Sequence, residues 1–264
     1  MSRPLRQGLL FLGALAFWEF LVRLHLWPDY LLPSPLQVGR TLADGLASGE
    51  LPLAIGVSLR RTLLGFGLTA LAGIAFGITI ARHPRLDDTI GSLMLGMQTL
   101  PSICWFPLAI LWFGLSEFSI LFIVGMGTFF SVVNSTVAGV KNVPPLYLRA
   151  GLNMGAHGYV LLWEVVLPAA LPSILSGLKQ GWSFAWRSLM AAELLFVNLG
   201  LGHLLSVGRE LNDMSQVLAV VLVILIIGIA VEMGVFAPLE RHLRVRWGLQ
   251  KSLSSVAETA PARS

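Results

Sequence analysis

Residues 144–172 read PPLYLRAGLNMGAHGYVLLWEVVLPAALP and interrupt the hydrophobic second half of the chain. This stretch predicts two short helices joined by a glycine turn. The first helix is expected over 146–154, because the double proline before it suits a helix's first turn. Gly155 permits a tight reversal of the backbone. The second helix is expected over 156–166 and ends against Pro168, because a residue before proline is pushed out of the α region.

The same stretch carries three large apolar side chains that a connecting segment must cover, Leu161, Leu162 and Trp163. Two coverings are possible. One is a docking partner, and the other is the membrane surface, where an amphipathic hairpin lies among the lipid headgroups.

The composition indicates an all-α integral membrane protein. Of the 264 residues, 55% are hydrophobic and 12% are charged, and the mean hydropathy is +0.77; a soluble domain is about 25% charged. The single cysteine, Cys104, excludes an intramolecular disulfide, and a zinc site of the Cys/His type is not expected. The net charge of +4 fits basic cytoplasmic loops. Nucleic acid is not expected as a partner, because no basic stretch interleaved with aromatic residues occurs.

About six segments are apolar and long enough to cross a bilayer as helices. They are expected at 8–27, 55–81, 89–113, 118–140, 172–196 and 216–238, within one transmembrane domain that spans 1–264. A signal peptide competes for the first segment, but no small-residue cleavage site precedes Pro28, so it is interpreted as a retained span. Pro101 and Pro107 break the third segment, which indicates either a cavity beside the freed carbonyls or a kinked packing helix.

Six spans leave both chain ends on the same side of the membrane. Lys and Arg concentrate in the two termini and in the loops at 82–88 and 141–171. Cytoplasmic segments favour these residues, so the termini and both loops are expected in the cytoplasm. Arg60 and Arg61 fall on the other side and contradict the rule.

Glycines are frequent in the second expected span, at 65, 67, 73 and 77. Small residues allow membrane helices to approach closely. Gly73 and Gly77 make a GxxxG pair, although chance is a fair alternative in so glycine-rich a helix.

Polar residues inside the third and fifth spans are candidates for a translocation path. Lys179, Ser183 and Arg187 are spaced four apart and therefore share one helix face. An arginine this deep faces either a partner or a water-filled path, and a guanidinium suits oxyanions. The alternative is a structural ion pair with Glu193, Glu19 or Glu232. The full candidate set is Gln98, Ser102, Trp105, Lys179, Ser183 and Arg187.

The spacing within 144–172 resembles the EAA loop of permease subunits of binding-protein-dependent ABC importers. That pattern is Glu-Ala-Ala, three residues, Gly, nine residues, then Ile-x-Leu-Pro. Here Arg149, Ala150 and Gly151 stand at the triplet, Gly155 is the glycine, and 165–168 close the pattern. The family's glutamate is replaced by arginine, and its second alanine by glycine. The resemblance implies that the loop couples to an ATPase through Arg149, Ala150, Gly151, Gly155, Ala156, Leu167 and Pro168.

Four further segments resemble the nitrate/sulfonate/taurine/bicarbonate branch of these permeases. They are PSP at 33–35, SLRRTLLGF at 58–66, FPLAILWFG at 106–114 and AAE at 191–193. The resemblance implies a type I ABC importer permease fold with a cytoplasmic coupling helix, in the cell inner membrane. It also implies a homodimer, two cytoplasmic ATPase subunits that hold ATP and Mg²⁺, and an extracytoplasmic solute-binding protein.

No catalytic residue, metal or cofactor is expected in this chain. None of its glycine-rich stretches has the Gly-x-x-x-x-Gly-Lys-Ser/Thr form that holds ATP phosphates. The expected substrate is a small anion, an aliphatic sulfonate or taurine first, with nitrate or bicarbonate next. A thiamine-precursor pyrimidine is the alternative within the family. Outside it, an ATP-independent channel or secondary transporter remains open, whereas a membrane-embedded enzyme lacks any nucleophile–base or metal constellation.

Overall fold

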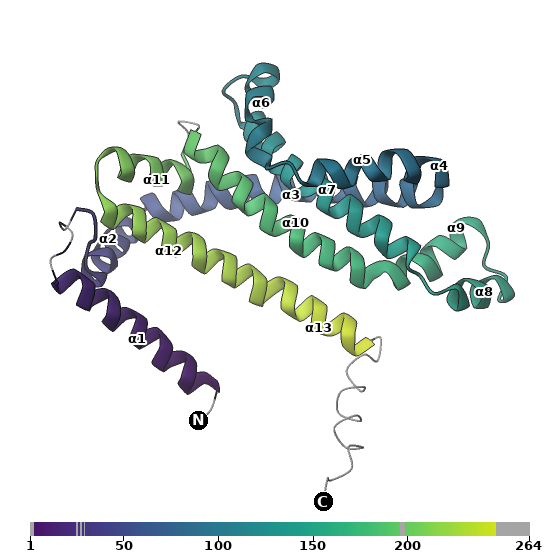
Figure 1. The fold of residues 1–264 in the computed structure, drawn as a ribbon, viewed down its shortest axis with the longest axis horizontal. Helices are drawn as coiled ribbons and strands as arrows, with labels where there is room; N and C mark the ends of the chain where they lie inside the picture. Colours follow the sequence, from purple (N-terminus) through teal and green to yellow (C-terminus); the bar gives the residue numbers. More distant parts are fainter. Residues whose placement is uncertain (1–2, 25, 27, 29, 196–198, 247–264) are drawn as a thin grey trace, which may run out of the picture.

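A computed structural model describes residues 3–24, 26, 28, 30–195 and 199–246, and every regular element among them is a helix (Figure 1). The expected all-α class is confirmed. The elements are α1 (Arg3–Arg23), α2 (Pro35–Ala47), α3 (Glu50–Arg82), α4 (Pro84–Leu86), η1 (Asp87–Gly91), α5 (Ser92–Gln98), η2 (Ser102–Trp105), α6 (Phe106–Phe113), α7 (Glu117–Lys141), α8 (Pro145–Asn153), α9 (Gly158–Leu161), η3 (Leu162–Val166), α10 (Leu167–Leu195), α11 (Leu201–Glu210), α12 (Met214–Val231), η4 (Glu232–Phe236) and α13 (Ala237–Arg246).

Four described helical segments are long and apolar enough to cross a membrane: Glu50–Arg82, Glu117–Lys141, Gly158–Leu195 and Met214–Val245. A fifth candidate is a broken pair, Pro84–Gln98 with Ser102–Phe113, bent by 103°. The sequence predicts about six spans. The span expected at 8–27 corresponds to α1, which is not among these five candidates. In Figure 1 the long helices run roughly along the long axis of the molecule, with α2 and α11 at one end and α8 and α9 at the other.

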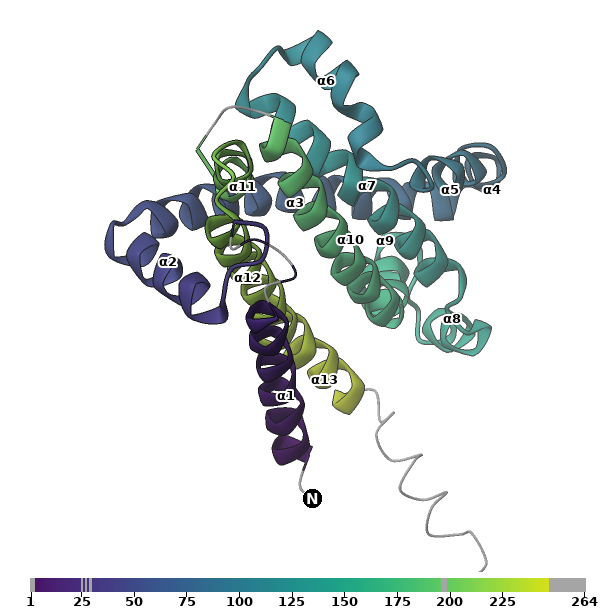
Figure 2. The same cartoon turned by 60° about the vertical axis from the view of Figure 1, so that its left-hand side comes forward.

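The break in the third expected span is a sharp turn. Pro101 has the extended ψ of 134° between α5 and η2, and α6 projects at a steep angle to α5 while its Ala109 stays buried in the core (Figures 1 and 2). Pro107 breaks nothing, because it lies in the first turn of α6, where its missing N–H costs no helical hydrogen bond. Only one of the two prolines therefore divides the segment.

The prediction that a helix ends against Pro168 and a new span starts near Pro172 is wrong. One continuous helical segment, Gly158–Leu195, runs through both prolines. Its π-helical turn η3 directly precedes Pro168. A proline ring clashes with the carbonyl four residues earlier in a regular α-helix, and the wider π turn relieves that clash. The sixth expected span likewise continues beyond 238, through η4 and α13.

Glycines set the close approach of α3 to α7. A Cβ built on Gly65, Gly73 or Gly77 would meet a side chain of α7 at 2.8–3.1 Å, 3.1 Å and 2.7 Å respectively. Their neighbours on α7 are Val124, Val132 and Thr136. The Gly73–Gly77 pair is therefore part of a helix-packing stripe. Gly67 points into open space and takes no part.

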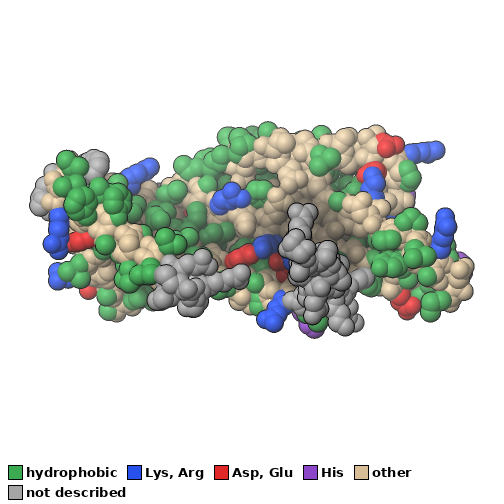
Figure 3. All heavy atoms as spheres, turned by 60° about the horizontal axis from the view of Figure 1, so that its bottom comes forward, with side chains coloured by type: hydrophobic (Ala, Val, Ile, Leu, Met, Phe, Trp, Pro, Cys, Tyr) green, Lys and Arg blue, Asp and Glu red, His purple; other side chains and the backbone are tan. Residues whose placement is uncertain are grey.

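The surface of the described part is strongly apolar. Leu71 is 71% exposed and Leu111 78% exposed, and many other leucines and isoleucines of the long helices are exposed as well. The face in Figure 3 carries charged side chains mainly at its two ends and in one group near the middle. Such a surface suits lipid or partner helices, because soluble monomers rarely expose large apolar patches.

Candidate functional site

The segment between α7 and α10 contains two short helices, α8 and α9, joined by a tight turn. After α8, the backbone reverses at Gly155, whose φ of +88° is a left-handed conformation that favours glycine. His157 Nδ1 lies 2.8 Å from the Gly155 carbonyl oxygen and closes the turn. The chain then enters α9 at Gly158, which also has a positive φ, +60°. The residues from α8 to η3 are referred to below as the coupling loop.

Gly151 allows α8 to pack directly against the start of the next helix. The residue is buried, and a Cβ built on it would lie 2.9 Å from both Leu161 Cδ1 and Val165 Cγ2. This position is the second alanine of the EAA pattern, and here the smaller glycine draws the two helices closer. The replaced first position, Arg149, is exposed, and so is Ala150. Ala156 lies half-buried in the turn, and Leu167 and Pro168 lie half-buried at the start of α10.

The outer face of the coupling loop is apolar and aromatic. Met154 is 88% exposed, Tyr159 75% and Trp163 64%. Tyr159 is held in place by Arg82 at the end of α3, whose guanidinium carbon lies 5.5 Å from the ring centre. Large apolar and aromatic side chains therefore project from this end of the bundle.

A second feature is a cavity of about 350 Å³ beside the break between α5 and η2. It brings together three of the six candidate path residues, Gln98, Ser102 and Arg187. Two lining residues that sequence reasoning missed are Gly127 on α7 and Ser188 on α10. The break at Pro101 thus opens onto a cavity, which was one of the two alternatives for a proline-interrupted span.

Arg187 has no carboxylate partner among the described residues. Its Nε donates to the Ser183 carbonyl oxygen at 3.1 Å, and its guanidinium carbon lies 5.0 Å from the centre of the Phe184 ring. The three acids considered as ion-pair partners are engaged elsewhere: Glu19 with Arg23, Glu193 with Arg61 and Glu232 with Lys179. The structural-pair alternative for Arg187 therefore finds no support in this structure.

The other three candidate path residues do not line this cavity. Lys179 Nζ is 2.5 Å from Glu232 Oε1 and 3.7 Å from Glu240 Oε2, so it joins α10 to η4 and α13. Ser183 bonds to the Lys179 carbonyl oxygen and lines a larger apolar groove on the other side of Arg187. Trp105 packs against Phe122 and Phe130 in an aromatic cluster.

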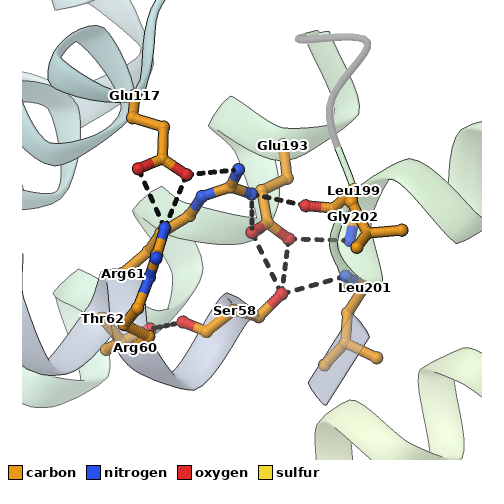
Figure 4. A network of polar contacts seen from close by, with 9 residues as sticks. All are labelled: Ser58, Arg60, Arg61, Thr62, Glu117, Glu193, Leu199, Leu201 and Gly202. Carbon is orange, nitrogen blue, oxygen red and sulfur yellow. Dashed lines mark hydrogen bonds and ion pairs between the residues drawn. The ribbon is translucent and has the colours of Figure 1, made fainter. Parts of the chain in front are cut away.

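A buried polar network (Figure 4) lies at the end of the bundle that carries α11, opposite the coupling loop (Figure 1). Its centre is Glu193 on α10, which is fully buried and accepts hydrogen bonds from Ser58, Arg61 and the Gly202 amide. Arg61 also reaches Glu117 on α7, and the neighbouring Arg60 does so as well. The arginines that contradicted the positive-inside rule thus serve as ion partners, Arg61 as a buried side chain and Arg60 as an exposed one.

Comparisons with known proteins agree with this architecture. The family model described as "binding-protein-dependent transport system inner membrane component" matches residues 73–244. A putative ABC transporter permease protein of Methanocaldococcus jannaschii is 34% identical over 226 residues, 84% of each chain. The Escherichia coli taurine transport system permease protein TauC is 34% identical over 247 residues, 90% of each chain. The putative aliphatic sulfonates transport permease protein SsuC of Bacillus subtilis is 29% identical over 81% of this chain and 78% of its own. Other relatives are named for riboflavin, formylaminopyrimidine and nitrate transport.

Proposed function

This chain belongs to the family of inner membrane components of binding-protein-dependent transport systems, and from that membership we propose that it is the permease of an ATP-driven importer for a small anion. An aliphatic sulfonate or taurine is the first candidate substrate, and nitrate or bicarbonate the next. The permease itself changes no bond. ATP, with Mg²⁺, is hydrolysed on a separate subunit.

The observation that carries the anion proposal is the state of Arg187. It lies on a membrane-spanning helix, lines a cavity of about 350 Å³, and has no carboxylate partner among the described residues. A charge within a membrane segment is costly unless it is paired or faces water, and such residues mark substrate pathways. An uncompensated guanidinium beside a cavity favours an anionic guest.

The coupling loop supports the ATP-driven mechanism. Movement of an ATPase pair must reach the membrane helices through a rigid contact. Gly151 packs α8 tightly onto the next helix, and the turn at Gly155 presents Met154 outward. Because the helix that starts at Gly158 continues unbroken to Leu195, a push on the loop is transmitted directly to the helix that carries Arg187. We assign the docking of the ATPase to Arg149, Ala150, Gly151, Gly155, Ala156, Leu167 and Pro168.

The proposed assembly contains two copies of this chain, two cytoplasmic ATPase subunits and an extracytoplasmic solute-binding protein. Both termini and the coupling loop lie in the cytoplasm in this proposal. The exposed apolar sides of the long helices support contact with lipid and with a second copy. The candidate path, besides Gln98, Ser102 and Arg187, includes Trp105, Lys179 and Ser183 at its margins.

The test is solute uptake into vesicles that hold this chain with its ATPase and binding protein. The solutes are taurine, a longer alkanesulfonate, nitrate, bicarbonate and a hydroxymethylpyrimidine, each with and without ATP. ATP-dependent uptake of an anion is the expected result. Uptake of the neutral pyrimidine alone would keep the importer class and refute the anion. Uptake that ignores ATP would indicate a channel or secondary transporter and refute the proposal.

A further inference from the structure

We propose that the cavity beside Arg187 is a binding subsite for the sulfonate group of an alkanesulfonate whose tail carries no charge. This inference rests on the proposed function and names the substrate class of the same path. It depends on which atoms line the cavity: hydrogen-bond donors and one cation at one side, and apolar side chains elsewhere.

Gln98 lines the cavity, and the oxygen of its side-chain amide is already hydrogen-bonded. Its Oε1 accepts a hydrogen bond of 2.5 Å from Asn134 Nδ2 on α7. Asn134 is itself oriented by a second contact, to the Met94 carbonyl oxygen at 3.3 Å. Because the oxygen of the Gln98 amide is occupied, its Nε2 is the group left for a guest, and it carries two N–H donors.

A pair of serines supplies a further donor. Ser188 Oγ, buried on α10, donates to Ser102 Oγ on η2 at 2.6 Å. A hydroxyl has one hydrogen to donate. Ser188 donates its hydrogen to Ser102, so the hydrogen of the Ser102 hydroxyl remains available for a guest. The chain of two hydroxyls polarises that last donor. Gly127 makes room for the pair, since a Cβ there would lie 2.3 Å from Ser188 Oγ.

Arg187 is oriented with its terminal nitrogens unused. Its Nε is bonded to the Ser183 carbonyl oxygen and its plane lies near the Phe184 ring. The two Nη groups make no hydrogen bond within the described part of the chain and form a fork that fits two oxygens of an oxyanion. Arg187, Ser102 and Gln98 come from three different elements and together offer donors for an anion with three equivalent oxygens.

The remaining walls favour a short hydrocarbon tail. Ile103, Phe130 and Phe184 line the cavity, and of its described lining residues none is acidic. A tail that ends in an ammonium, as in taurine, therefore finds no counter-charge there. The volume of about 350 Å³ lies at the low end of the roughly 300–1,000 Å³ typical of pockets for organic ligands. It leaves room beyond a bare inorganic anion.

The experiment measures equilibrium binding to the full-length permease–ATPase complex in lipid nanodiscs, with the binding protein left out. The probes are propane-1-sulfonate, taurine and nitrate. The first two are near-isosteres that differ in a terminal methyl or ammonium group. We expect propane-1-sulfonate to bind at least about tenfold more tightly than either other probe. Against nitrate, each methylene or methyl group moved out of water contributes about fourfold. Against taurine, the difference is one methyl in place of an ammonium, which would be buried without a counter-charge.

Substitutions test the donors directly. Arg187→Gln is expected to weaken propane-1-sulfonate binding by about tenfold or more, and Ser102→Ala by about fivefold. Arg40→Gln, on the exposed face of α2, is the matched control and should change nothing. Co-elution with the ATPase in size-exclusion chromatography shows that each variant is folded and assembled.

The outcomes separate this inference from the proposed function. If ATP-driven anion uptake persists but binding is indifferent to Arg187→Gln and Ser102→Ala, the subsite is refuted while the importer stands. Taurine binding more tightly than propane-1-sulfonate would refute the uncharged tail. The absence of any ATP-dependent uptake in the vesicle assay would refute the proposed function itself.

Discussion

Arg61 and Glu193 form a buried ion pair across 132 residues of sequence. Arg61 Nη1 donates to Glu193 Oε1 at 2.9 Å, and the two side chains are 4% and 0% exposed. The same carboxylate accepts from Ser58 on α3 and from the Gly202 amide at the start of α11. One buried charge therefore ties α3, α10 and α11 together, at the end of the bundle away from the coupling loop.

Removing one member of this pair should destabilise the protein severely. Glu193→Gln leaves the Arg61 charge buried without its main partner, which typically costs about 3–5 kcal/mol. We expect a lowered thermal unfolding temperature of the detergent-purified chain and a poor yield. Glu50→Gln, an exposed carboxylate at the start of α3, is the matched control with little effect. Equal stabilities of the two variants would contradict the role of the pair.

Gly155→Trp should abolish co-purification of the ATPase subunit. The residue has a φ of +88°, which side-chain-bearing residues rarely adopt, and it lies in the turn that we assign to docking. The control is Gly39→Trp on α2, where no atom lies within 4 Å of an added Cβ. Pull-down from membranes, with the permease level measured by blot, reads out the result. An unchanged ATPase signal for Gly155→Trp would refute the docking role of this turn.

Gly151 should tolerate alanine but not valine. An alanine Cβ would lie 2.9 Å from Leu161 Cδ1, the free end of a flexible side chain, and 2.9 Å from Cγ2 of the stiffer, β-branched Val165, so both methyl groups must shift a little. A valine adds two more methyl groups to the same space, and overpacking of this kind typically costs about 1–3 kcal/mol. We expect Gly151→Val to reduce transport-stimulated ATP hydrolysis strongly, with Gly151→Ala near the parent. Equal rates for both variants would show that α8 is not packed against the following helix.

The sequence predicted the all-helical class and the backbone reversal at Gly155, because local rules determine both. Glycine and proline set the turns, and apolar runs set the spans. The prediction of a helix end at Pro168 failed. It relied on the local rule that a residue before proline leaves the α region. The π turn at Leu162–Val166 overrides that rule by widening the helix.

Ion partners could not be predicted for a different reason. Arg61 was interpreted through charge counting alone, whereas its partners Glu117 and Glu193 are 56 and 132 residues away in sequence. Glu193 was considered as a partner of Arg187, and spacing along one helix could not reveal its actual partner, Arg61. Gln98, Ser102 and Arg187 were found because polar residues stand out in apolar spans. Gly127 and Ser188 were missed because small residues in a membrane helix usually signify packing.

Gly127→Ala should weaken anion transport while the complex stays assembled. The added methyl would meet Ser188 Oγ at 2.3 Å and push that hydroxyl away from Ser102. Loss of one hydrogen bond predicts about a fivefold weaker affinity for the transported anion. Gly67→Ala, where a Cβ meets open space, is the control. Concentration-dependent uptake gives the apparent affinity, and an unchanged value for Gly127→Ala would contradict a role for the serine pair.

Lys179 and Arg187 lie on the same helix. A double substitution of Lys179 and Glu232 tests whether Lys179, unlike Arg187, acts only as an ion partner. Lys179 Nζ is 2.5 Å from Glu232 Oε1, so Lys179→Gln leaves the Glu232 carboxylate unpaired on a candidate membrane-spanning segment. We expect this single variant to lose stability and uptake together. Lys179→Gln combined with Glu232→Gln removes both charges and should restore uptake to within about twofold of the parent, since contacting residues couple in this way. Uptake and thermal unfolding are measured on all variants. If the double variant is stable but still fails to transport, Lys179 acts on the anion itself, and the path extends past Arg187 toward α13.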